Sequence, residues 1–284
     1  MDANPENNSR WDEIKRHWFV ENVWLWLLPG LFMGGILGYL IGIRSTADLD
    51  DWFISGIWPE ILSTCVAVAL IYRLDRWRDN VRETQRLKRD LLWQVKSRSN
   101  EMAIGAIDRL RYEGWLEGEN GLLAGADLSE TNLAQANLND ANLKGTDFTG
   151  ANLEGATFIR SELENSSFDL AFLAQACLYN ADMSNASIWK TDLTGAKFQS
   201  TKAIGTRIRR SNLGDAFIGA FTDFEDADLS LTNLANAIIV DPTAFKSNTT
   251  MPDGKLYSPE DDLSRFTDVG HKDFERNEWN EGDD

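Results

Sequence analysis

Few residues of this chain could perform acid–base or metal chemistry. The only histidines are His17 and His271, so none falls in the central segment 121–240, and the only cysteines are Cys65 and Cys177. A general base or a transition-metal site is usually built from histidine or cysteine. The chain also has no glycine-rich loop of the kind that binds phosphates. We therefore expect no enzyme activity, no metal site and no cofactor.

The charged residues point to binding rather than catalysis. The formal net charge is -17, and the aspartates of segment 121–240 follow a five-residue spacing that suggests a structural role. Nucleic-acid affinity depends on clustered lysine and arginine. The acidic composition therefore argues against general nucleic-acid binding.

One stretch departs from this acidic character. Residues 183–214 contain six basic residues and one acidic residue. Arginine and lysine beside an exposed aromatic ring suit a phosphate-bearing ligand, an acidic segment of a partner protein or anionic lipid headgroups. Alternatively, the arginines only neutralise the acidic stretch 215–228 that follows. The candidate site consists of Trp189, Lys190, Arg207, Arg209 and Arg210.

The element that would position these residues is a five-residue repeat. Between residues 121 and 240 a large apolar residue recurs at nearly every fifth position, with one six-residue step from Ile218 to Phe224 that predicts a bulge. A five-residue step rotates a helical side chain by roughly 140° and alternates faces on a flat strand, so neither keeps these residues inside. A chain that turns a corner every five residues keeps all of them in the interior.

The other positions of the repeat follow the same period. The residue two before each apolar centre is never larger than threonine, as at Ala126 and Thr131. The residue directly before the centre is often Asp or Asn, as at Asp127 and Asn132. Such short polar side chains satisfy backbone groups at turns. This pattern resembles the pentapeptide-repeat family.

That resemblance implies a fold. It implies a right-handed quadrilateral β-helix of about six coils, with four pentads in each coil and the apolar centres stacked inside. Side chains twenty residues apart should then lie one above another on the surface. This would place Arg209 next to Trp189 and Arg210 next to Lys190.

Two apolar stretches before the repeat predict a transmembrane hairpin. Residues 23–43 contain no charged residue, and as a helix they would span about 31 Å. Residues 53–72 form a second stretch, interrupted only by Pro59 and Glu60, and aromatic residues flank both stretches, as at membrane interfaces. A buried core hairpin or a cleavable signal peptide are the alternatives, which the lengths and the second stretch disfavour.

Two features of the hairpin are candidates for function. Gly30, Gly34, Gly38 and Gly42 share one face of the first span, where they would allow the second span, or a second copy of the chain, to approach closely. Glu60 would be a costly charge inside a membrane and therefore a candidate functional residue. Alternatively, it lies at the outer interface and is hydrated.

Basic residues set the expected orientation. They precede the first span and follow the second, whereas the connecting loop is mainly acidic. Because positively charged flanks stay in the cytoplasm, both termini and the repeat should be cytoplasmic, in a bacterial inner membrane. Segment 1–22 would then be an N-terminal cytoplasmic helix.

The remaining segments connect and close the repeat. Residues 73–120 should form a charged helical linker and a cap for the first coil, with a weak heptad pattern through Leu91 and Val95 that suggests a coiled-coil dimer. Residues 241–269 resemble the segment that seals the last coil in pentapeptide-repeat proteins. Residues 270–284 are polar enough to be disordered.

The sequence thus predicts a membrane-anchored binding or scaffolding module, with the lipid bilayer and an unidentified protein as partners. An alternative is an oligomeric membrane assembly, a pore or a stress-responsive effector, in which the hairpin is the working part. The resemblance also offers a DNA mimic that acts on a type II topoisomerase. Arg160 lies twenty residues after Asp140 and interrupts the acidic row that such a mimic needs.

The predicted topology can be tested by cysteine labelling in a background without Cys65 and Cys177. Cysteines at Asn8 and Asn248 should be protected from an impermeant thiol reagent in intact cells, and one at Asp50 should be labelled, because the basic flanks stay inside. Permeabilised cells provide the control that each cysteine can react. Labelling of position 248 in intact cells would contradict a cytoplasmic repeat.

Overall fold

A computed structural model of the chain describes residues 58–274. The predicted helix 1–22, the first span 23–43 with its four glycines, and the start of the second span lie outside the described residues. The chain divides into two units, residues 1–81 and residues 82–284, which are described separately.

The described part of the first unit is helical. Helix α4 (Trp58–Val95) includes most of the predicted second span and continues into the predicted linker without a break. Within residues 58–274, no helix combines the length and the apolar composition that crossing a membrane requires. The transmembrane hairpin therefore remains a prediction from the sequence, and for Glu60, in the first turn of α4, the structure describes only the backbone.

The second unit begins with two helices that close the first coil of the repeat. Leu91 and Val95 of α4 are buried in one core with Ile107 and Leu110 of helix α5 (Asn100–Tyr112). The chain then joins the repeat through Leu116, whose carbonyl accepts a 2.8 Å hydrogen bond from a backbone N–H of the next coil. Because this cap buries Leu91 and Val95, the suggested coiled-coil seam is wrong at these two positions.

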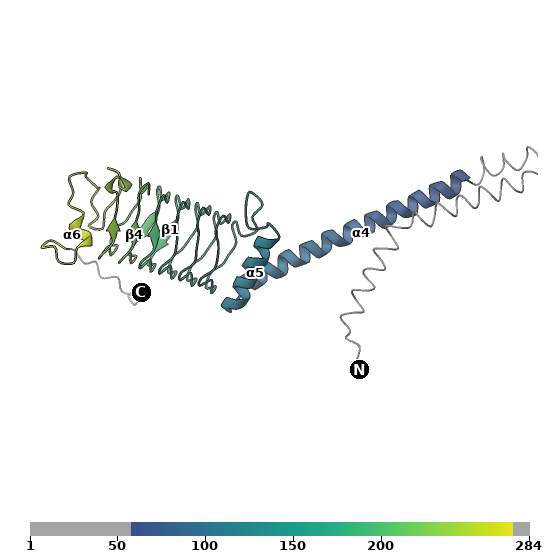
Figure 1. Cartoon of the computed structure of the whole chain (residues 1–284), viewed down its shortest axis with the longest axis horizontal. Coiled ribbons are helices and arrows are strands. Elements are labelled where there is room, and N and C mark those ends of the chain that lie inside the picture. The colour runs from purple at the N-terminus through teal and green to yellow at the C-terminus, as the bar shows by residue number, and fades with distance from the viewer. Residues whose placement is uncertain (1–57, 275–284) are drawn as a thin grey trace, which may run out of the picture. The chain divides into compact units, whose positions relative to one another are not determined.

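The repeat forms a stack of coils (Figure 1). Parallel bridges join residues twenty apart, such as Asp127 with Asp147 and Asn132 with Asn152. Each coil therefore takes four pentads, as the sequence predicted. Only short stretches are regular strands: β1 (Ser187–Trp189) pairs with β3 (Arg207–Arg209), and β2 (Lys197–Phe198), β4 (Phe217–Ile218) and β5 (Ile238–Ile239) form a parallel sheet in that order.

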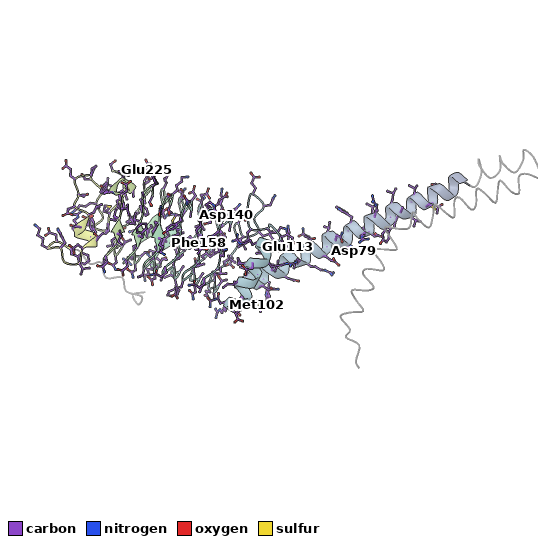
Figure 2. All side chains as sticks on the ribbon, viewed as in Figure 1. Asp79, Met102, Glu113, Asp140, Phe158 and Glu225 are labelled. Carbon is purple, nitrogen blue, oxygen red and sulfur yellow. The ribbon has the colours of Figure 1, made fainter. Side chains whose placement is uncertain are left out.

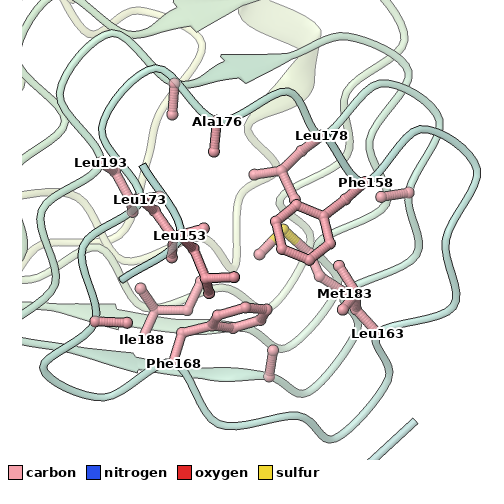
Figure 3. Close-up of a cluster of buried hydrophobic side chains, with 14 of the residues drawn as sticks. Leu153, Phe158, Leu163, Phe168, Leu173, Ala176, Leu178, Met183, Ile188 and Leu193 are labelled. Atoms are coloured by element: carbon pink, nitrogen blue, oxygen red, sulfur yellow. The ribbon is translucent and has the colours of Figure 1, made fainter. Parts of the chain in front are cut away.

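The apolar centres fill the interior of the stack (Figure 3). Phe148 and Phe168, one coil apart, are stacked with ring centroids 5.0 Å apart, and Phe158 meets both rings edge-on. Such pairs add to the stabilisation from burial alone. Buried hydroxyls at the small positions are satisfied as well: Thr191 donates to the carbonyl of Phe168 at 2.6 Å.

The corners of the coils are formed by the residues two positions after the apolar centres. At these positions the backbone is left-handed even in residues with side chains, with φ of 54° at Glu130 and 61° at Leu170. This conformation costs an L-residue roughly 1–2 kcal/mol. Hydrogen bonds between coils hold the corners, as from the Glu130 N–H to the Thr149 carbonyl at 2.9 Å.

The six-residue step forms the predicted bulge. After it, the pairing interval changes from twenty residues to twenty-one, so that Arg207 faces Asp228 and Phe217 faces Ile238. The extra residue is accommodated at a corner, where Phe221 has a φ of 63° and is 84% exposed. The bulge therefore leaves the interior register intact.

A compact cap closes the far end. Phe245 stacks on Phe224 at 5.6 Å, and Met251, Tyr257 and Phe266 are buried beneath it. The cap includes the 3-10 helix η2 (Pro242–Ala244) and helix α6 (Ser264–Thr267). Ordered contacts continue to Phe274, beyond the predicted boundary at residue 269, because His271 forms a 3.3 Å ion pair with Asp262 when protonated.

Two ion pairs between coils predict a loss of stability in acid. Arg160 donates two hydrogen bonds to Asp140, which lowers the pKa of that carboxyl. Partial burial raises the pKa of Asp182, but hydrogen bonds from Lys202 and Ser184 outweigh this and hold it below the ordinary 3.8. Carboxyls with a lowered folded-state pKa stabilise the fold fully above pH 3.8 and lose this effect as the pH falls through the folded-state pKa.

We expect the thermal unfolding midpoint of the whole chain to be lower at about pH 3 than at neutral pH. The decrease should be smaller in a variant with Asp140→Asn and Asp182→Asn, because both carboxyls are removed. Circular dichroism measures the midpoint. An equal decrease in the variant and the wild type would contradict the role assigned to the two pairs.

Candidate functional site

The candidate residues of the sequence analysis come together on one side of the stack. In β1 and β3 the centres Ile188 and Ile208 are buried, so their neighbours point outward. Trp189 lies directly beside Arg209 in the paired strands and is 38% exposed, and Arg207 is exposed two residues before Arg209.

The next corner adds two more cations. Lys190 and Arg210 both have left-handed backbone, with φ of 51° and 53°, and the Lys190 N–H donates to the Arg209 carbonyl at 3.1 Å. The corners therefore stack one above the other. The Lys190 ammonium lies 4.9 Å from the centroid of the Trp189 ring, a distance typical of a cation–π contact. Trp189, Lys190, Arg207, Arg209 and Arg210 are called the basic patch below.

The arginines of the basic patch have different environments. Arg209 donates to the Ser230 hydroxyl at 3.0 Å and lies 3.4 Å from an Asp228 carboxylate oxygen, so it partly neutralises the next coil. This is the alternative considered from the sequence, and for Arg209 it is confirmed. The side chains of Arg207 and Arg210 are exposed and form no hydrogen bond or ion pair with any residue between 58 and 274.

Several other cations of the repeat are paired across coils. Arg160 binds Asp140, and Lys202 lies 2.8 Å from an oxygen of Asp182. Arg207 also has an aspartate opposite it in the next coil, but that residue, Asp228, pairs with Arg209 instead. The guanidinium groups of Arg207 and Arg210 therefore have no partner within residues 58–274.

An apolar border surrounds the cations, and the sequence analysis missed it. Leu170 is 46% exposed at the corner one coil before Lys190, Phe172 is 48% exposed nearby, and Leu231 is exposed at the corner after Arg210. Large apolar residues at corner positions, where polar residues and glycine predominate, are the signal that would have revealed the border. The site thus combines positive charge with apolar surface.

The basic patch and its apolar border can bind an anionic group. Within the described residues there is no group of three or more His, Cys, Asp and Glu side chains that could hold a metal ion. Asp169, one coil before Trp189, accepts hydrogen bonds from the Ser187 hydroxyl at 2.8 Å and the Trp189 N–H at 2.9 Å. These two hydrogen bonds position β1. Exposed guanidinium forks next to aromatic and aliphatic side chains bind carboxylates that are accompanied by apolar groups.

The other sites proposed from the sequence receive no structural description. The four glycines of the first span lie outside residues 58–274, and Glu60 is described only in its backbone. The row of acids required for a DNA mimic is interrupted at Asp140, which is labelled in Figure 2, because Arg160 donates two hydrogen bonds of 2.6 and 2.7 Å to it.

Comparison with known families agrees with the fold. Eight copies of the family model for pentapeptide repeats match the chain, over residues 122–155, 147–185 and 176–215. Residues 122–215 therefore match the pentapeptide-repeat family. None of the curated proteins compared with the chain matches it.

Several solved structures are similar to the chain. A pentapeptide repeat protein from the Arabidopsis thaliana thylakoid lumen is 22% identical, over 46% of this chain and 79% of that chain, with a TM-score of 0.27. QnrB1, a plasmid-mediated fluoroquinolone resistance protein, is 16% identical over 47% and 80%, with a TM-score of 0.32. Rfr23 from the cyanobacterium Cyanothece 51142 is 20% identical over 48% and 90%, with a TM-score of 0.25.

Proposed function

We propose that the chain is a non-catalytic protein-interaction module, and that the basic patch binds an acidic, partly apolar segment of a partner protein. The observation that carries this proposal is the pair of exposed guanidinium groups of Arg207 and Arg210, which have no partner among the described residues, beside the half-exposed indole of Trp189. Acidic segments with apolar residues complement such a surface in both charge and polarity.

The rigidity of the site supports this proposal. Ile188 and Ile208 anchor the two strands in the core, and the strands are paired to each other in register. A preformed surface loses little conformational entropy on binding. Trp189 and the arginines are also the residue types that contribute most to the energy of protein interfaces.

We also propose that the module is attached to a bacterial inner membrane with the repeat in the cytoplasm. The uncharged stretch 23–43, the second apolar stretch 53–72 and the basic residues on their flanks support this part of the proposal. A membrane attachment would concentrate the basic patch near membrane-bound partners. The hairpin itself would then serve as an anchor, with the glycine row packing its two helices together.

The binding function can be tested with a photo-crosslinking amino acid in the full-length chain in cells. Placed at Trp189, the crosslinker should form an adduct with a partner protein, because it lies in the basic patch. Gln199 is the matched control, since it follows its centre in the same way but lies two pentads further on, on the opposite side of the coil. A crosslinker there should form no such adduct.

Charge variants complete the test. Arg207→Glu and Arg210→Glu should each reduce the adduct at position 189 by about tenfold, the change expected when one charge-assisted contact is replaced by repulsion. Lys197→Glu carries the same type of change outside the basic patch and should leave the adduct unchanged. Equal adducts in all variants, or equal adducts at positions 189 and 199, would contradict binding at the patch.

A further inference from the structure

We infer that the chain contains its own ligand for the basic patch: the acidic segment 275–284, which follows the C-terminal cap, binds there and competes with an external partner. This inference rests on the proposed function in that both use the same surface. It adds an intramolecular occupant and a means of regulating access.

The composition of the segment complements the patch. Residues 275–284 contain five acidic residues and one basic residue, giving a formal charge of -5 + 1 = -4, and one large aromatic residue, Trp279. The patch presents four cations, and two of them, Arg207 and Arg210, have no partner between residues 58 and 274. Its apolar border of Leu170 and Phe172 offers a surface for an indole ring.

Part of the cap from which the segment continues lies on the same side of the stack as the patch. Thr250 of the cap bridges to Asp228, which bridges to Arg207, so the cap lies two strand steps beyond the patch on the same side. Two steps correspond to about 10 Å. The described chain stays on the cap up to Phe274, because Arg265 binds Asp253 and His271 contacts Asp262.

The segment is long enough to reach the patch. Ten residues in extended conformation span up to about 33 Å, more than the two strand steps that separate Thr250 of the cap from Arg207. Binding within one chain also has an effective concentration in the millimolar range. A contact that is weak between separate molecules would therefore still fill the site.

A second exposed surface is an alternative binding site for the Trp279 side chain. Phe217, Phe221, Ile238 and Val240 form an apolar area near the cap, at β4, β5 and the bulge. That area would accept an aromatic ring without the help of the acidic residues. Contacts at the basic patch should weaken with salt, whereas contacts at the apolar area should not.

The experiment uses the full-length chain with a photo-crosslinking amino acid at Trp279. We expect intramolecular crosslinks to the peptide that contains residues 207–210, identified by mass spectrometry, and we expect their yield to fall in high salt. Arg207→Glu combined with Arg210→Glu should abolish these crosslinks, and adding Glu278→Lys and Glu281→Lys should restore them. Lys197→Glu, outside the patch, should have no effect. The inference would be overturned by crosslinks to Phe221 or Ile238, by the absence of any crosslink to the repeat, or by the absence of rescue in the charge-exchange variant.

A binding measurement gives a second, independent readout. A synthetic peptide of residues 275–284 should bind a chain that ends at Phe274 at least about tenfold more tightly than it binds the full-length chain, where the attached segment already occupies the patch. Equal binding to both chains would overturn the inference. The proposed function can fail separately: it fails when the crosslinker at Trp189 captures no partner protein even in the chain that ends at Phe274.

Discussion

The structure depends on one constraint: an apolar side chain must point inward at every fifth residue. The backbone meets it by taking a left-handed conformation two residues after most centres, and the coils hold that conformation through hydrogen bonds to their neighbours. These bonds and the stacked centres depend on each other, because a corner without its neighbour would carry an unsatisfied backbone and a strained residue. The caps at both ends exist for the same reason, since an open coil would expose unpaired groups.

This constraint also determines how a binding surface is made. Side chains one coil apart lie next to each other, so a change of residue type at two or three positions creates a patch instead of isolated residues. Ser187 and Trp189 face Arg207 and Arg209 in this way, and the corner residues Lys190 and Arg210 follow. The repeat fixes the spacing between side chains on neighbouring coils. The residue types at a few stacked positions then determine what this surface can bind.

Much of the fold could be predicted from the sequence because one rule repeats many times. The coil length, the bulge between Ile218 and Phe224, and the proximity of Arg209 to Trp189 all follow from counting. Which cation pairs with which acid does not follow from counting. Asp228 lies opposite Arg207 but binds Arg209, a choice made by side-chain conformations that the repeat leaves free.

The helices outside the repeat were harder to predict for a different reason. Leu91 and Val95 have the spacing of a coiled-coil seam, and the structure uses them to cap the first coil. An apolar stripe on a helix indicates that something covers it, but not what. For the apolar segments that precede residue 58 the same ambiguity applies, and there the membrane assignment rests on the sequence alone.

The central claim is that the five-residue register, more than any individual contact, specifies the rod, and paired deletions in the full-length chain test it directly. Removing residues 151–170 takes out one whole coil and keeps the register, so the variant should retain its circular dichroism spectrum and unfold cooperatively. Removing residues 151–171 leaves a four-residue step, which, unlike the extra residue at the bulge, cannot be accommodated at a corner. We predict that this second variant loses cooperative unfolding. Equal cooperativity and equal unfolding temperatures for the two deletions would contradict the account.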